Sequence, residues 1–236
     1  MSPRPTGMKA FTLIWLGQVL SIFGSSMTGF AMGLWAFEKS QGQATPMILI
    51  WFFNFAPGLI FSPVAGALVD RWNRKLVMMI SDIATGVTTL IILLLMSSTV
   101  LEIWHLYILG IFAGTFGAFQ WPAQSAAISS MIPKEQYNRA AGMLSLSEWL
   151  PQVFAQPAAV ALLAIIGTTG IMTIDLITLS LALLMLFIIK VPQPKVSAEG
   201  VESRGSLAKE SMYGFRYIWQ RPSLLGLQLV FFCGNL

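Results

Sequence analysis

The chain has 236 residues, of which 56% are hydrophobic and only 10% are charged. A soluble globular domain carries about a quarter charged residues, so this composition excludes an ordinary soluble domain and predicts an integral membrane protein. The formal net charge of +4 is therefore interpreted as membrane topology, and no nucleic-acid partner is expected.

Six stretches are long and apolar enough to cross a bilayer as helices, which takes about 20 residues. A seventh apolar stretch begins near Leu224 and reaches Leu236 after about thirteen residues, too few to cross. We therefore expect an all-α membrane protein: a six-helix transmembrane bundle over residues 1–190 and the start of a seventh helix over 223–236. The chain is then a fragment of something longer. The six predicted crossings are residues 11–36, 46–69, 76–97, 103–131, 139–165 and 171–190.

The placement of Lys and Arg tests this count, because basic residues collect in cytoplasmic loops. If the N-terminus is cytoplasmic, six crossings put 13 of the 14 basic residues inside and only Lys39 outside. The reverse orientation, or one crossing fewer, removes that asymmetry. The expected location is the cell (inner) membrane, as a multi-pass protein with the lipid bilayer as a partner.

The composition of the chain changes after the sixth predicted crossing, where the long apolar stretch ends. Residues 191–206 contain Pro, Ser and Gly and predict a flexible cytoplasmic linker. Apolar residues then recur at helical spacing among charges, which predicts an amphipathic helix on the inner membrane surface; an ordinary membrane-entry segment is the alternative. Linker and helix together occupy residues 191–222, and the apolar positions are Leu207, Met212, Phe215, Ile218 and Trp219.

A short charged loop joins the second and third predicted crossings, after 30 residues (40–69) without a charge. Charges are costly in hydrocarbon, so this loop lies at a membrane surface. The loop region contains Gly66, Leu68, Asp70, Arg71, Arg74 and Lys75. This pattern resembles the signature loop of the major facilitator superfamily. Asn73 stands where that family usually has Gly, and we attribute this to the tolerance of Asn for positive φ in a tight turn.

Four further stretches carry a narrower resemblance: residues 15–18, 121–126, 132–135 and 214–218. They resemble the drug- and macrolide-efflux-like branch of the superfamily, which includes siderophore exporters. One departure bears on the direction of transport: residues 155–158 read Ala-Gln-Pro-Ala where exporters often show Gly-Pro-x-x-Gly. The resemblance implies that the loop's Asp and Arg residues hold cytoplasmic helix ends together in one state of the transport cycle and release them in the other.

Three acids, Asp82, Glu148 and Asp175, fall inside predicted crossings, and such acids are functional candidates by default. At a rise of about 1.5 Å per residue, Glu148 lies about 14 Å from Arg139, close to the midplane. We expect Glu148 to couple proton entry to substrate movement or to pair with a cationic substrate; a purely structural acid is the equal alternative. Support of the signature loop is favoured for Asp82 and helix-end capping for Asp175, although both remain coupling candidates.

Three classes of function compete: a secondary transporter, an intramembrane enzyme, and a membrane scaffold or receptor. The single His, His105, has no companion ligands, so no metal, no catalytic residue and no cofactor is expected. No nucleotide-binding loop is present in the sequence.

The expectation is a secondary active transporter. It exports amphiphilic small molecules (drug, macrolide or siderophore-like) by proton-coupled antiport and alternating access. Such a transporter needs two halves, so a missing C-terminal half or a second chain is an expected partner. A non-transporting scaffold or receptor, or an inactive truncated half-transporter, is the alternative.

Overall fold

The computed structural model describes residues 7–189, 191 and 219–234, and no strand occurs among them. Long helices dominate because the bilayer favours backbone groups that are satisfied within one segment, even where Pro122, Pro151 and Pro157 lie inside a helix. The elements are α1 (Gly7–Lys39), α2 (Ala44–Arg71), α3 (Arg74–Ser97), α4 (Ile103–Met131), the short 3₁₀ helix η1 (Lys134–Gln136), α5 (Tyr137–Ile188) and α8 (Pro222–Gly234).

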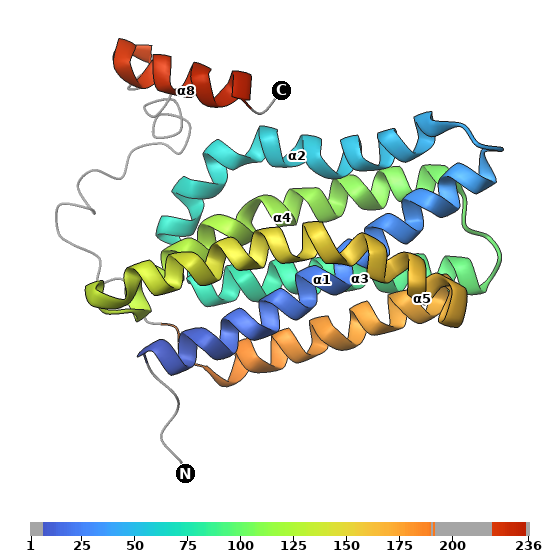
Figure 1. The fold of residues 1–236 in the computed structure, drawn as a ribbon, viewed down its shortest axis with the longest axis horizontal. Helices are drawn as coiled ribbons and strands as arrows, with labels where there is room; N and C mark the ends of the chain where they lie inside the picture. Colours follow the sequence, from blue (N-terminus) through green and yellow to red (C-terminus); the bar gives the residue numbers. More distant parts are fainter. Residues whose placement is uncertain (1–6, 190, 192–218, 235–236) are drawn as a thin grey trace.

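Helix α5 is a hairpin of two arms. Gly167 has φ 66° and ψ −178°, a conformation that essentially only glycine adopts, and the helix reverses direction there. Figure 1 shows the first arm (137–166, yellow) running along the bundle and the second arm (168–188, orange) returning beside α1. The predicted fifth and sixth crossings thus correspond to two arms joined by one sharp turn.

Five helices within the described ranges are long and apolar enough to cross a membrane, and α5 with its two arms counts as one of them. The all-helical membrane fold is confirmed, whereas six crossings and the start of a seventh stay predictions. The predicted linker and most of the amphipathic segment fall on residues 192–218, outside the described residues. The qualifying ranges are Gly7–Lys39, Ala44–Ser62, Arg74–Ser97, Ile103–Ala127 and Tyr137–Ile188.

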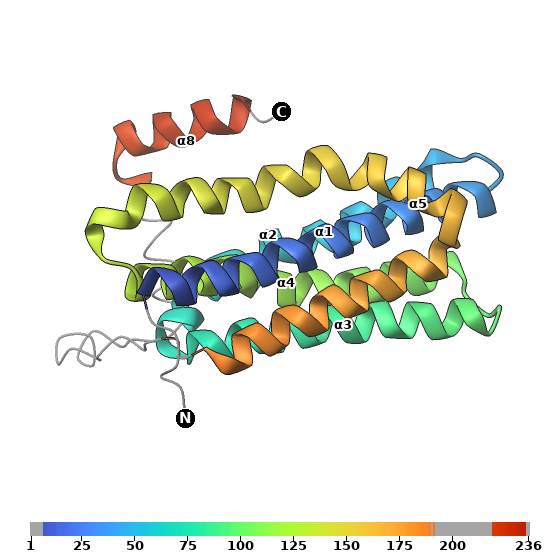
Figure 2. The ribbon, with the colours of Figure 1, turned by 60° about the horizontal axis from the view of Figure 1, so that its bottom comes forward.

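The connections between helices alternate between two ends of the bundle. The start of α1, the α2–α3 connection and the α4–α5 connection lie at one end, and the α1–α2 and α3–α4 connections lie at the other (Figures 1 and 2). At the second end Lys39 pairs with Glu102 across 3.0 Å, which joins the end of α1 to the start of α4.

Helix α1 lies between the two arms of α5, and α2 packs along α4 (Figures 1 and 2). Glycines allow close approach: a Cβ on Gly114 of α4 would lie 1.9 Å from the carbonyl oxygen of Asn54 in α2. Large apolar side chains such as Ile60, Ile165 and Phe187 cover the outer surface, more than 60% exposed. The bundle therefore presents an apolar exterior, as a lipid-facing protein requires, around a more polar interior.

Candidate functional site

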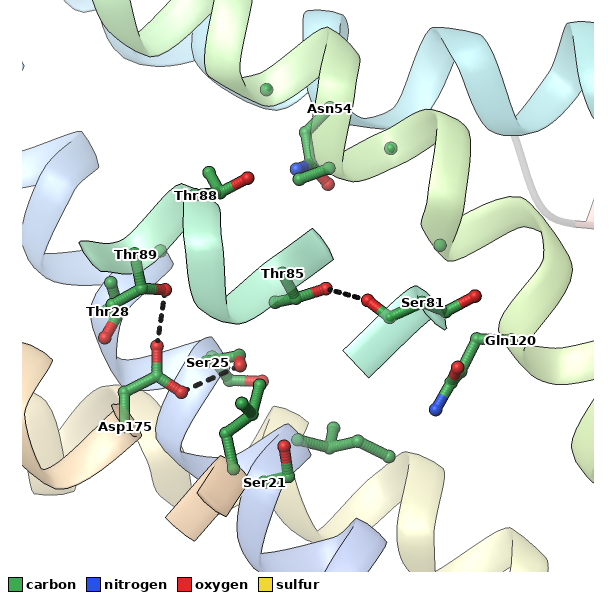
Figure 3. Close-up of a pocket in the computed structure, with 18 of the residues that line it drawn as sticks. Ser21, Ser25, Thr28, Asn54, Ser81, Thr85, Thr88, Thr89, Gln120 and Asp175 are labelled. Carbon is green, nitrogen blue, oxygen red and sulfur yellow. Dashed lines mark hydrogen bonds between the residues drawn. The ribbon is translucent and has the colours of Figure 1, made fainter. Parts of the chain in front are cut away.

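A cavity of about 660 Å³ lies inside the bundle, between α1, α2, α3, α4 and the second arm of α5. Most of its wall is apolar. Polar side chains point into it from several helices (Figure 3). Some of them form two groups, each built around one buried carboxylate, Asp82 or Asp175.

Asp82 is held by two amide side chains. Gln18 Nε2 donates to Oδ2 across 2.9 Å, and Gln120 Nε2 donates to Oδ1 across 2.8 Å. Gln120 Nε2 also lies 3.0 Å from Gln18 Oε1, so the three side chains link α1, α3 and α4. Asp82 is 6% exposed. Its observed partners lie within the bundle, whereas the sequence favoured support of the signature loop.

Asp175, on the second arm of α5, is only 1% exposed. Ser25 Oγ donates to its Oδ1 across 2.9 Å, and Thr89 Oγ1 donates to its Oδ2 across 3.1 Å (Figure 3). Gly24 permits this contact, because a Cβ there would lie 3.1 Å from Oδ1. The carboxylate thus accepts from side-chain hydroxyls of α1 and α3, whereas the sequence favoured capping of a helix end.

The charges of the cavity wall are of one sign. Asp82 and Asp175 line it, and no Lys, Arg or His is among its described lining residues. Within the described ranges, no group of three or more His, Cys, Asp or Glu side chains lies close enough together to hold a metal ion. What the cavity offers is oxygen and amide groups in an apolar setting.

Glu148 lies outside this cavity, exposed on the first arm of α5. Trp121 Nε1 of α4 donates to Glu148 Oε1 across 3.0 Å, and the Trp121 side chain is 61% exposed. Ser145, Gln152 and Gln156 are exposed at helical spacing on the same side of α5. Glu148 and these three residues, here called the α5 polar stripe, lie along one exposed face of the first arm of α5.

The signature loop ties helix ends together at one end of the bundle. Arg74 Nη1 donates to the Ala126 carbonyl of α4 across 2.6 Å. Lys75 Nζ donates to the carbonyls of Phe187 and Ile189, across 2.8 and 2.7 Å, at the end of α5. The loop therefore connects the start of α3 to both α4 and α5.

Asn73 does not adopt the conformation expected from the sequence. Its φ is −66°, and its side chain accepts a hydrogen bond from Leu76 N across 3.2 Å as the N-cap of α3. Asp70 and Arg71 end α2, and the Leu68 carbonyl accepts from Trp72 N across 2.9 Å. A Cβ on Gly66 would meet no described atom within 4 Å, so glycine there is not demanded by packing within the described part of the chain.

Sequence reasoning missed the amides and hydroxyls that surround the two buried acids. Gln18, Gln120 and Thr28 lie within apolar stretches of the sequence, and amides inside predicted crossings are the signal that could have pointed to them. The sequence also singled out Glu148 but missed Gln152 and Gln156, which share its face.

Comparison with known proteins supplies the family. The family model described as Major Facilitator Superfamily matches residues 14–236. Macrolide efflux protein A of Streptococcus pyogenes is 24% identical over 220 residues, which are 93% of this chain and 54% of the relative. Macrolide efflux protein A of Enterococcus faecalis is 23% identical over 177 residues, covering 75% of this chain and 54% of that protein.

An uncharacterized MFS-type transporter of Bacillus subtilis (strain 168), YfiS, is 21% identical over 223 residues, with 94% of this chain and 52% of the relative covered. No solved structure matches the chain. The chain spans about half the length of the curated relatives it matches. The expected resemblance to the superfamily and to its macrolide-efflux-like branch is confirmed. With the family model matching nearly its whole length, the chain belongs to the major facilitator superfamily of membrane transporters.

Proposed function

We propose that this protein exports amphiphilic small molecules, with macrolides as the first candidates, by alternating access. The single observation that carries the proposal is the exposed Glu148–Trp121 pair on the α5 polar stripe. A carboxylate exposed at membrane depth is costly against lipid tails, so this face meets water or another part of a transporter. The matches cover only 54% of each relative named macrolide efflux protein A, which supports the proposal of such a second part.

The chemistry of this face suits a cationic amphiphile. Glu148 offers a negative charge, while Trp121 and Trp149 offer broad aromatic surfaces that are 61% and 62% exposed. A ring face attracts a cation, and an apolar body gains from contact with the indoles. An amine-bearing apolar compound fits this combination better than an anion does.

Glu148 is also our candidate for proton coupling. A carboxylate that reaches an aqueous pathway can take up a proton from one side and release it to the other. Protonation and a cationic substrate would then compete for the same oxygen atoms, which couples the two fluxes in opposite directions. Because their observed partners lie within the bundle, Asp82 and Asp175 rank behind Glu148 for this role.

The signature loop is proposed as the latch between states. Arg74 and Lys75 bind carbonyls of α4 and α5, and Asp70 and Arg71 lie one short turn away. Contacts of this kind, worth a few kcal/mol together, are enough to shift a two-state equilibrium strongly when one state breaks them.

The test uses the natural-length protein in proteoliposomes with an imposed pH gradient and a radiolabelled macrolide. We expect proton-driven accumulation, and its loss in Glu148→Gln. Glu135→Gln, which changes an exposed acid of η1, is the matched control and should retain it. Full proton coupling in Glu148→Gln would refute the role of Glu148, and macrolide binding without flux would indicate a receptor or scaffold.

A further inference from the structure

Three side-chain hydroxyl groups lie close to the Asp175 carboxylate. Ser25 and Thr89 each donate one hydroxyl to it. A third hydroxyl, that of Thr28, lies close to the same carboxylate, and among the described residues its Oγ1 makes no hydrogen bond of good geometry. Thr28 is 6% exposed and lines the cavity, as Asp175 does (Figure 3).

A buried hydroxyl without a partner costs free energy, about 1–3 kcal/mol. A buried carboxylate without a compensating charge costs more. The Thr28 hydroxyl and the Asp175 carboxylate, which carry these two costs, both line the cavity, and no described basic side chain lines it. A bound cation would satisfy the Thr28 oxygen and neutralise Asp175 together.

The donor set indicates the kind of cation. All four groups, one carboxylate and three hydroxyls, are hard oxygen ligands, which suit hard metal ions and not Zn²⁺ or Cu²⁺. One carboxylate balances one positive charge. A divalent ion would leave an uncompensated charge in an apolar interior, so a monovalent ion is favoured.

We propose that Asp175, Ser25, Thr28 and Thr89 form a binding site for an alkali-metal cation inside the bundle. The site is separate from the α5 polar stripe, and it joins α1, α3 and the second arm of α5. It does not depend on the transport proposal, because cation binding can be measured in a protein that moves no substrate.

The experiment measures thermal unfolding of the natural-length protein in detergent at constant pH. Sodium chloride is titrated against choline chloride at equal ionic strength. We expect a sodium-specific rise in melting temperature that saturates. Asp175→Asn should abolish that rise, and Thr28→Val, which replaces the hydroxyl with a methyl group, should weaken the apparent sodium affinity by about tenfold or more.

Asp82→Asn is the matched control, because it alters the other buried carboxylate of the same cavity and should retain the sodium response. If Asp175→Asn does not fold, Thr28→Val decides. The proposal is overturned by the absence of a sodium-specific rise, by a rise that persists in Asp175→Asn, or by an unchanged sodium affinity in Thr28→Val.

Discussion

Substitution of Gly114 by Ala tests the packing of α2 against α4. The added Cβ would lie 1.9 Å from the Asn54 carbonyl oxygen and 2.8 Å from its carbonyl carbon, whereas real Cβ atoms essentially never approach closer than 3.0 Å. Both neighbours are backbone atoms, so no side chain can rotate away. The two helices must separate by about one ångström, and we expect the free energy of unfolding to fall by about 3 kcal/mol, the upper end for an overpacked core.

The assay is reversible unfolding of the natural-length protein in mixed micelles, followed by circular dichroism. Gly117→Ala is the matched control on the same helix, because a Cβ there meets no described atom within 4 Å. Alanine also forms helices better than glycine, so the control should be unchanged or up to about 1 kcal/mol more stable. A Gly114→Ala variant that unfolds no earlier than Gly117→Ala would refute the close approach of α2 and α4.

The same unfolding assay checks three further expectations. Gly167→Ala forces a side chain into a conformation reserved for glycine and should cost about 1–3 kcal/mol, whereas Gly142→Ala, which meets no described atom within 4 Å, should not. Gln18→Leu removes an amide donor from the buried Asp82 carboxylate and should cost about 1–3 kcal/mol. Lys75→Met removes two hydrogen bonds to carbonyls at the end of α5 and should cost about 1 kcal/mol. Unchanged stability of Gly167→Ala would contradict the turn conformation, and unchanged stability of Gln18→Leu or Lys75→Met would contradict the hydrogen bonds of that side chain.

Length and hydropathy were enough to predict the helices, because a membrane span needs a minimum number of apolar residues in a row. The loop charges located the boundary between α2 and α3, because charges are costly in hydrocarbon and collect at the membrane surface. The hydropathy pattern could not predict which helices contact one another. Trp121 and Glu148 are 27 residues apart, and Ser25 and Asp175 are 150 residues apart. A single sequence carries no signal that joins such positions.

Two local expectations failed for identifiable reasons. Asn is suited both to positive φ and to helix capping, so its presence at position 73 does not separate the two, and the structure shows the cap. Asp175 follows a predicted loop by only a few residues, which favoured capping. The turn is confined to Gly167, however, so Asp175 lies two turns into the second arm and faces the interior.

The proposed transport function requires that the α5 polar stripe faces an aqueous pathway and not lipid. Cysteine accessibility in the natural-length protein, with native thiols replaced, measures this directly through labelling by a membrane-impermeant thiol reagent. Gln152→Cys should be labelled, while Phe154→Cys, exposed on the opposite side of the same helix turn, should stay unlabelled. Equal protection of both positions would show that no aqueous pathway reaches the stripe, and would contradict the proposed role of this face.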